Sequence, residues 1–209
     1  MEYEVRFYFY VSEKEKLLNK FSSIKGLNKS NRKYEKTIQY NHCDSRYDFY
    51  SKEIDGRFRI RISKEPDNTE CKLSWKQRIK DYDTSIVNQE IEKEIHIKED
   101  EIEDFQYIVQ NVMHFNLVES YERYRTTFSN DDIEIALDEY PFGIAVEIEN
   151  KSKMLNPEEN VLKYVKRVGL DISKRYCLSW DDKYAKLCQE QNIPIYKEVT
   201  FDKEMPSVF

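Results

Sequence analysis

The chain has 209 residues and a net charge of -6, with 39% hydrophobic and 35% charged residues. This length predicts a single domain with its own core. Glycine and proline are scarce, with 4 and 5 residues, which argues against disordered or collagen-like structure. The acidic balance argues against nucleic-acid binding through a generally basic surface.

The four cysteines form no CxxC pair and have no histidine at ligand spacing, so neither a zinc site nor a disulfide framework is expected. No apolar run approaches the roughly 20 residues that span a bilayer, and no signal-like segment opens the chain. These features predict a soluble cytoplasmic protein with reduced thiols and no membrane partner.

The first predicted element is a β-strand over residues 2–7, where Glu2, Glu4 and Arg6 alternate with apolar side chains. Alternate side chains of a strand share a face, so both carboxylates and the guanidinium point the same way. Two carboxylates this close repel each other unless a cation lies between them. The segment therefore indicates half of a metal site.

A helix with an apolar stripe is expected to begin at Ser12 and to end near Gly26. A polar loop over residues 28–36 and a strand-like stretch over residues 36–50, of uncertain register, follow it. Three strands with one charged face come next: three arginines over residues 57–62, two lysines over residues 71–76 and three glutamates over residues 90–95. Asp81-Tyr82-Asp83 is turn-like.

The second half of the chain continues with helices and strands. Residues 147–149 place Glu147 and Glu149 on one strand face, which gives a second pair of carboxylates to match the first. The other expected elements are a helix over residues 98–116, a hairpin over residues 121–137, helices beginning at Asn156 and Ser179, and an edge strand that residues 193–201 could form.

Nearly every predicted strand carries charge on one face, and two interpretations compete. An antiparallel sheet commonly has one solvated face, where such residues are ordinary. Consecutive like charges on one strand are nevertheless unfavourable unless opposite charges interleave. Charged faces that line a closed barrel of about eight strands explain the pattern, with helices covering the apolar outer faces. The predicted fold is therefore α+β, an antiparallel closed β-barrel with a tunnel and flanking α-helices.

Such a tunnel combines oxygen ligands for a hard divalent cation with cations that bind a polyanion. Arginine suits the second task because its planar fork matches phosphate oxygens. The candidate metal ligands are Glu2, Glu4, Glu147, Glu149 and Asp138. The candidate substrate-binding residues are Arg6, Arg57, Arg59, Arg61, Lys76, Arg123 and Arg125. The candidate catalytic residues are Glu90 and Glu92, which could orient a water, and Lys76.

Several blocks, in order, resemble the CYTH or triphosphate tunnel metalloenzyme superfamily, from residue 2 to about residue 187. The N-terminal Glu2-Tyr3-Glu4-Val5-Arg6 is similar to the family's ExExK signature, with Arg in place of Lys. Asn88-Gln89-Glu90-Ile91-Glu92 resembles an R-x-E-I-E segment without its leading basic residue. The other matching blocks are 57–61, Leu73-Ser74-Trp75-Lys76, Arg123-Tyr124-Arg125, 137–149, and Gly169-Leu170 with Ser179-Trp180-Asp181-Asp182.

The resemblance implies a barrel tunnel over residues 1–192, with residues 193–209 as a C-terminal tail, and Mg²⁺ or Mn²⁺ as cofactor. It implies a small-molecule triphosphate as substrate, namely ATP, tripolyphosphate or thiamine triphosphate. Hydrolysis by a triphosphatase is the leading hypothesis. The alternatives are a class IV adenylyl cyclase and a non-catalytic polyphosphate- or nucleotide-binding module. Nucleic acid is not expected, except an RNA 5′-triphosphate end, and a homodimer is also considered.

Overall fold

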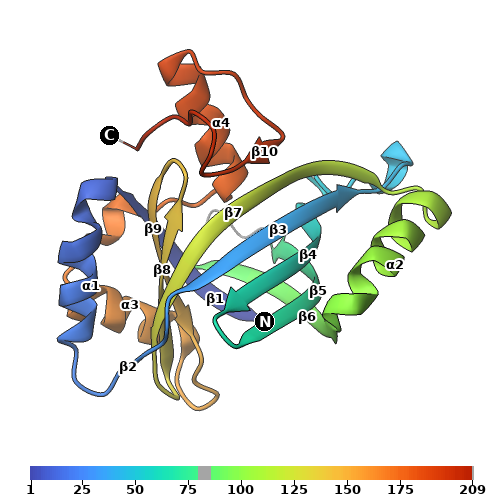
Figure 1. The fold of residues 1–209 in the computed structure, drawn as a ribbon. Helices are drawn as coiled ribbons and strands as arrows, with labels where there is room; N and C mark the ends of the chain where they lie inside the picture. Colours follow the sequence, from blue (N-terminus) through green and yellow to red (C-terminus); the bar gives the residue numbers. More distant parts are fainter. Residues whose placement is uncertain (80–85, 209) are drawn as a thin grey trace.

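The computed structural model describes residues 1–79 and 86–208. Within them, eight antiparallel strands pair in the ring β7-β3-β4-β5-β6-β1-β9-β8, and β8 pairs again with β7 (Figure 1). The predicted closed barrel is therefore confirmed. The strands are β1 (Glu2–Phe9), β3 (Lys33–Asn41), β4 (Gly56–Glu65), β5 (Asn68–Ile79), β6 (Asn88–Ile97), β7 (Asn116–Ser129), β8 (Ile133–Tyr140) and β9 (Gly143–Asn150).

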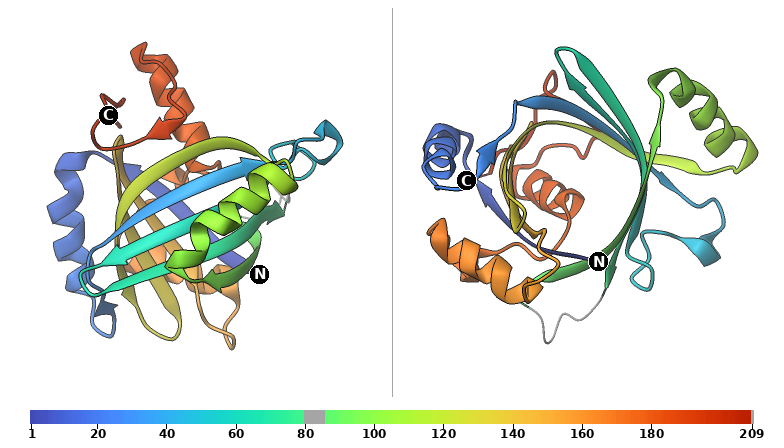
Figure 2. Two further views of the ribbon diagram at one scale, coloured as in Figure 1. Left: turned by 45° about the vertical axis from the view of Figure 1, so that its right-hand side comes forward. Right: turned by 90° about the horizontal axis from the view of Figure 1, so that it is seen from below.

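Two short strands lie outside the ring, and both pair with β7. β2 (Asn28–Lys29) pairs with it antiparallel, and β10 (Glu198–Val199) pairs with it parallel. The four α-helices of the described residues lie around the barrel (Figures 1 and 2). They are α1 (Lys14–Ser22), α2 (Ile102–Tyr107), α3 (Pro157–Arg167) and α4 (Trp180–Gln191).

The alternation within each strand decides which side chains face the tunnel. On β1, Val5 and Phe7 are each 2% exposed and pack in the main core, whereas Glu4 and Arg6 line the cavity. That core also contains Phe21 of α1 and residues of α3, which cover the outside of β1, β8 and β9. The predicted arrangement of apolar faces outward under helices and charged faces inward is therefore present.

The remaining helices cover other parts of the barrel. Residues of α2 and the π-helical turn Ile108–Val112 pack on the outer faces of β3 and β4. Helix α4 stands across the upper end of the barrel, and from below it is visible through the ring of strands (Figure 2). Trp180 in its first turn packs against Tyr121 and Tyr140 of the barrel wall. One end of the tunnel is thus covered by a helix.

Several predicted boundaries were wrong. The expected loop over 28–36 contains β2 and the start of β3, and the strand expected over 36–50 ends at Asn41. The first helix is preceded by a 3₁₀ turn at Val11–Glu13, where Glu13 rather than Glu15 accepts a backbone N–H, that of Tyr10. The helix expected over 98–116 is divided into 3₁₀, α and π turns. The turn expected at residues 81–83 lies outside the described residues.

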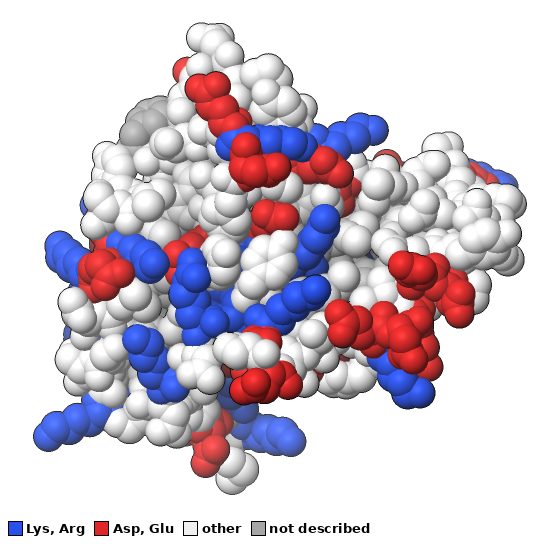
Figure 3. Space-filling view, viewed as in Figure 1, with Lys and Arg blue, Asp and Glu red and all other residues white. Residues whose placement is uncertain are grey.

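The C-terminal residues pack against the barrel. Val199 of β10 is fully buried beside α4, and the N–H of Val208 donates to the carbonyl of Phe142 over 2.8 Å. The edge-strand prediction holds only for residues 198–199, and the division into a domain and a tail at residue 192 stays a prediction. In the described part of the chain, no helix is both long and apolar enough to cross a membrane. The outer surface viewed in Figure 3 carries charges of both signs.

The barrel wall should depend on the packing of α1. Phe21 is fully buried and meets Phe128 edge to face at 5.6 Å, so Phe21→Ala should lower the free energy of unfolding by about 3–5 kcal/mol. Chemical denaturation measures this loss. Tyr107→Ala is the control, because that ring is 64% exposed, and it should change stability by about 0.5 kcal/mol or less. Equal losses in both variants would contradict this packing.

Candidate functional site

A cavity of about 320 Å³ runs inside the barrel and is lined by side chains from all eight ring strands. A volume of this size holds a small ligand. All seven predicted substrate-binding cations line it, together with the predicted carboxylates Glu2, Glu4, Glu147 and Glu149 and the predicted catalytic residues Glu90 and Glu92. Ser179, Trp180 and Asp181 of the α4 end complete the lining.

Three carboxylates gather around one ammonium group in this cavity. Glu2 and Glu4 come from β1, and Glu90 is brought beside them because β6 pairs with β1 in the register Glu2 opposite Glu90. The Nζ atom of Lys76 lies 3.1 Å from Glu2 Oε2, 3.2 Å from Glu4 Oε2 and 2.5 Å from Glu90 Oε2. Carboxylate oxygens of the three glutamates lie within 4.8 Å of one another.

This cluster fits a hard divalent cation. Its donors are carboxylate oxygens, which Mg²⁺ and Mn²⁺ prefer. Glu2 Oε2 and Glu90 Oε2 are also buried, and neither has a hydrogen-bond partner within residues 1–79 and 86–208. Glu90, which the sequence suggested as a catalytic residue, lies among the predicted metal ligands.

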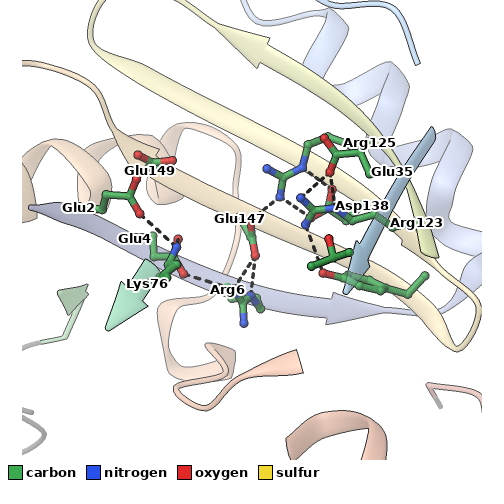
Figure 4. A network of polar contacts seen from close by, with 12 residues as sticks. Glu2, Glu4, Arg6, Glu35, Lys76, Arg123, Arg125, Asp138, Glu147 and Glu149 are labelled. Atoms are coloured by element: carbon green, nitrogen blue, oxygen red, sulfur yellow. Dashed lines mark hydrogen bonds and ion pairs between the residues drawn. The ribbon is translucent and has the colours of Figure 1, made fainter. Parts of the chain in front are cut away.

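The other predicted metal ligands are already paired with cations, and of these Glu149, which is opposite Glu4 on β9, lies beside Glu2 (Figure 4). Glu147 accepts from Arg6 Nε at 2.8 Å and from Arg125 Nη2 at 2.6 Å. Glu149 pairs with Lys151 at 2.7 Å. Their assignment as metal ligands stays a prediction.

Asp138 is fully buried and is held by two arginines. Its Oδ2 atom lies 2.9 Å from Arg123 Nη1 and 2.6 Å from Arg125 Nη2. The lining of the cavity includes both arginines but not Asp138. The geometry thus shows Asp138 as the group that holds the two guanidinium groups in place.

The arginines of β4 point across the tunnel and are each fixed by a polar partner. Arg59 Nε donates to Ser74 Oγ at 2.8 Å, and its Nη2 pairs with Glu92 at 2.6 Å. Arg61 Nε donates to Thr37 Oγ1 at 3.2 Å. Arg57 reaches the first turn of α4, where its Nη2 lies 3.1 Å from Asp181. These contacts pre-orient the guanidinium groups, which lowers the entropy cost of binding a ligand.

The enclosed charges perturb one another strongly. Burial raises the pKa of Glu2 to about 8, although Lys76 opposes the rise, and the adjacent Glu92 carboxyl adds to it. Burial would raise the pKa of Glu92 too, but its hydrogen bond with Glu2 and the charges of Lys76 and Arg59 hold this pKa below its ordinary value. Glu92 is therefore the ionised member of the pair. Shifts of this kind are typical of functional sites.

Some lining residues had escaped the sequence analysis. Arg78 extends the alternation of Lys72, Ser74 and Lys76 on β5 by one more step, so the pattern contained a signal for it. Glu35 lies in a segment that had been predicted as a loop, and Asp181 comes from the helix at the tunnel end. The positions of Glu35 and Asp181 in the lining could not be derived without knowing how these segments pack.

No family model and no curated protein matches the sequence. Several solved structures match the fold. The PH1819 protein of Pyrococcus horikoshii OT3 has a TM-score of 0.61 and 22% identity, covering 91% of this chain and 99% of its own. The PH1012 protein of the same organism has a TM-score of 0.65 and 16% identity, covering 86% and 97%.

A third similar structure is that of HpAC1 from Hippeastrum, with a TM-score of 0.57 and 17% identity over 93% of this chain and 98% of its own. Identities this low establish similarity of fold. This chain and these solved structures share one fold, and its closed antiparallel barrel is the fold that the resemblance implied.

Tyr121 offers a direct test of the electrostatics of the tunnel. Burial favours its neutral phenol, but Arg61, Arg123 and Arg59 outweigh this effect and lower its pKa to about 8. Since the pKa in the unfolded chain is about 10, the phenolate stabilises the fold, and this stabilisation is lost as the pH falls through about 8.

We expect a near-ultraviolet absorbance titration of the folded protein to show one tyrosinate forming near pH 8. The same step should be absent in Tyr121→Phe. Tyr8 serves as the matched control, because burial raises its pKa, so Tyr8→Phe should keep the step. A titration without any tyrosinate below the ordinary range would show that the three guanidinium groups do not act on this ring.

Proposed function

We propose that this protein is a divalent-metal-dependent enzyme that binds a triphosphate in the barrel tunnel and hydrolyses it. The observation that supports this proposal is the combination, in one cavity, of a cluster of three carboxylates with the seven predicted cationic side chains. The carboxylates suit a hard metal ion, and the guanidinium groups suit phosphate oxygens. A charged sheet face that only contacts solvent, which is the competing interpretation, would not need to be enclosed in a barrel.

Each side chain has a role in the proposed reaction. Arg59, Arg61 and Arg123 would bind phosphate oxygens and neutralise their charge, which is the main task in phosphoryl transfer. A bound metal would supply Lewis-acid stabilisation of the charge that develops in the transition state. Glu2, Glu4 and Glu90 would hold it.

Glu92 is proposed to orient the attacking water. Its lowered pKa keeps it ionised and therefore able to accept a hydrogen bond from water. Arg59 holds this carboxylate at 2.6 Å, which limits its rotation. Because Glu92 follows Glu90 on the same face of β6, the water would lie beside the proposed metal position.

Hydrolysis and cyclisation are the two reactions that similar structures suggest. The Hippeastrum protein is described as having a dominant triphosphatase activity. Those from Vibrio parahaemolyticus and Bacillus halodurans are described as candidate adenylate cyclases. A class IV adenylyl cyclase is therefore the second candidate, in which the ribose 3′-hydroxyl replaces water as nucleophile and pyrophosphate leaves.

A small-molecule triphosphate suits the cavity better than nucleic acid does. On the face viewed in Figure 3, basic groups near the centre are bordered by acidic groups, whereas an RNA would need a continuous basic path. ATP, tripolyphosphate and thiamine triphosphate are the proposed substrates, with Mg²⁺ or Mn²⁺. Cytoplasmic location, a homodimer and action on an RNA 5′ end stay predictions.

The test is to incubate the protein with each triphosphate and Mn²⁺ or Mg²⁺ and to separate the products. Orthophosphate from tripolyphosphate or thiamine triphosphate would support hydrolysis. Cyclic AMP with pyrophosphate from ATP would support the cyclase instead. Tight binding without turnover of any of the three would reject both reactions and favour the binding module.

Within this proposal, Glu4→Gln should lower the metal-dependent turnover by about 100-fold or more, because Glu4 is 2% exposed and supplies a charged metal ligand. The fold should be retained, since Gln keeps the shape of the side chain, while Lys76 keeps Glu90 and Arg6 keeps Glu147 as partner. Glu15→Gln, an exposed residue of α1, is the control and should keep full turnover. Unchanged turnover in Glu4→Gln would reject the metal assignment.

A further inference from the structure

The ammonium group of Lys76 lies among the three carboxylates that form the candidate metal site. It contacts all three carboxylates of the Glu2, Glu4 and Glu90 cluster at 2.5 to 3.2 Å. Lys76 reaches the cluster from β5, where it is opposite Glu92 on β6, and its side chain is only 16% exposed. The strands of the barrel therefore bring one lysine to the centre of three acidic residues.

Lys76 Nζ lies close to three carboxylates, yet most of these contacts do not have the geometry of a hydrogen bond. Only the contact with Glu4 Oε2 has hydrogen-bond geometry. Glu2 Oε2 and Glu90 Oε2 lie close to Nζ but have no hydrogen-bond partner among the described residues. The three donors of an ammonium keep tetrahedral angles to one another, whereas a metal ion makes no such directional demand. The carboxylates thus form a cage that suits a spherical cation better than it suits an ammonium.

We propose that Lys76 is a built-in substitute for the metal ion, so that the metal and the ammonium group compete for the same three carboxylates. Arrival of a divalent cation releases the Lys76 ammonium into the tunnel, where it becomes available to a phosphate group. Lys76 thereby couples metal binding to polyanion binding. This inference rests on the proposed function for its biological meaning, but the competition itself is a property of the metal site.

The coupling between metal binding and polyanion binding is positive in both directions. A polyanion attracts the Lys76 ammonium away from the cluster, which leaves the carboxylates free for the metal. A metal releases the ammonium, which then strengthens binding of the polyanion. Because binding free energies are linked, each ligand must raise the affinity for the other by the same factor. The carboxylates stay neutralised in both states, so the fold need not change.

The experiment measures Mn²⁺ binding without any substrate, from the loss of the electron paramagnetic resonance signal of free Mn²⁺. Lys76→Met removes the competing charge and leaves an unbranched side chain that is one heavy atom shorter. It should bind Mn²⁺ about tenfold more tightly than the wild type, or better, because the three carboxylates then lose the one cation that they share. Weaker or unchanged binding in Lys76→Met would overturn the proposal.

The matched control is Lys72→Met. Lys72 lies on the same face of β5 and pairs with Glu70 and Glu94, outside the cluster. Its substitution should leave Mn²⁺ affinity within about twofold of the wild type if only local competition matters. A similar gain in both variants would point to a general change in tunnel charge and would also overturn the proposal.

A second measurement covers the case in which Lys76→Met does not fold. Crystals of the wild-type protein soaked in Mn²⁺ should show the ion among Glu2, Glu4 and Glu90, with Lys76 Nζ moved away from them. An ion bound elsewhere, with Nζ still in the cluster, would refute the competition. Neither measurement uses turnover, so a protein that hydrolyses no triphosphate could still confirm the competition, and an active one could still refute it.

Discussion

The pairing of charges inside an enclosed barrel is the constraint on which the rest of the structure depends. An ion removed from water costs several kcal/mol unless an opposite charge and hydrogen bonds replace its hydration. Arg123 illustrates the requirement, since its side chain is 3% exposed and lies between Glu35 and Asp138. A barrel that encloses so many ionised groups must arrange them as partners from different strands.

The strand order and the register provide these partners. Along one strand the charges often have one sign, and at some positions the neighbouring strand carries the other sign. Lys76 on β5 is opposite Glu92 on β6, and Arg6 on β1 is opposite Glu147 on β9. The sequence of like charges within a strand, which would be unfavourable on an isolated sheet, thus becomes favourable once the neighbouring strand carries the other sign.

The sequence predicted what depends on local alternation. Each strand with a regular pattern of charged and apolar residues, such as residues 57–62, was found with its charged face in the tunnel. What it could not predict depends on pairing between distant segments. Lys33 begins a strand because β4 and β7 offer hydrogen bonds on both sides, although its surroundings in the sequence are those of a loop.

The same limit applies within the site. Glu2 and Glu4 were predicted as metal ligands because they share a strand face, and that part of the cluster needs only local geometry. Glu90 joins them through a strand register that no local pattern encodes. Glu147 was assigned to the metal by its own local pattern, yet it lies between Arg6, which is opposite it on β1, and Arg125 of β7.

The charges in the tunnel are already paired with one another. A polyanion can therefore bind only if it replaces carboxylates as the partners of the arginines. Arg6 and Arg125 can turn to phosphate oxygens only if they release Glu147, and a released buried carboxylate must find another cation. The proposed divalent metal ion would add that positive charge to the tunnel. The proposed requirement for metal and the proposed affinity for polyphosphate would therefore be two consequences of one balance of charge, because either ion alone would leave the tunnel with an unpaired partner.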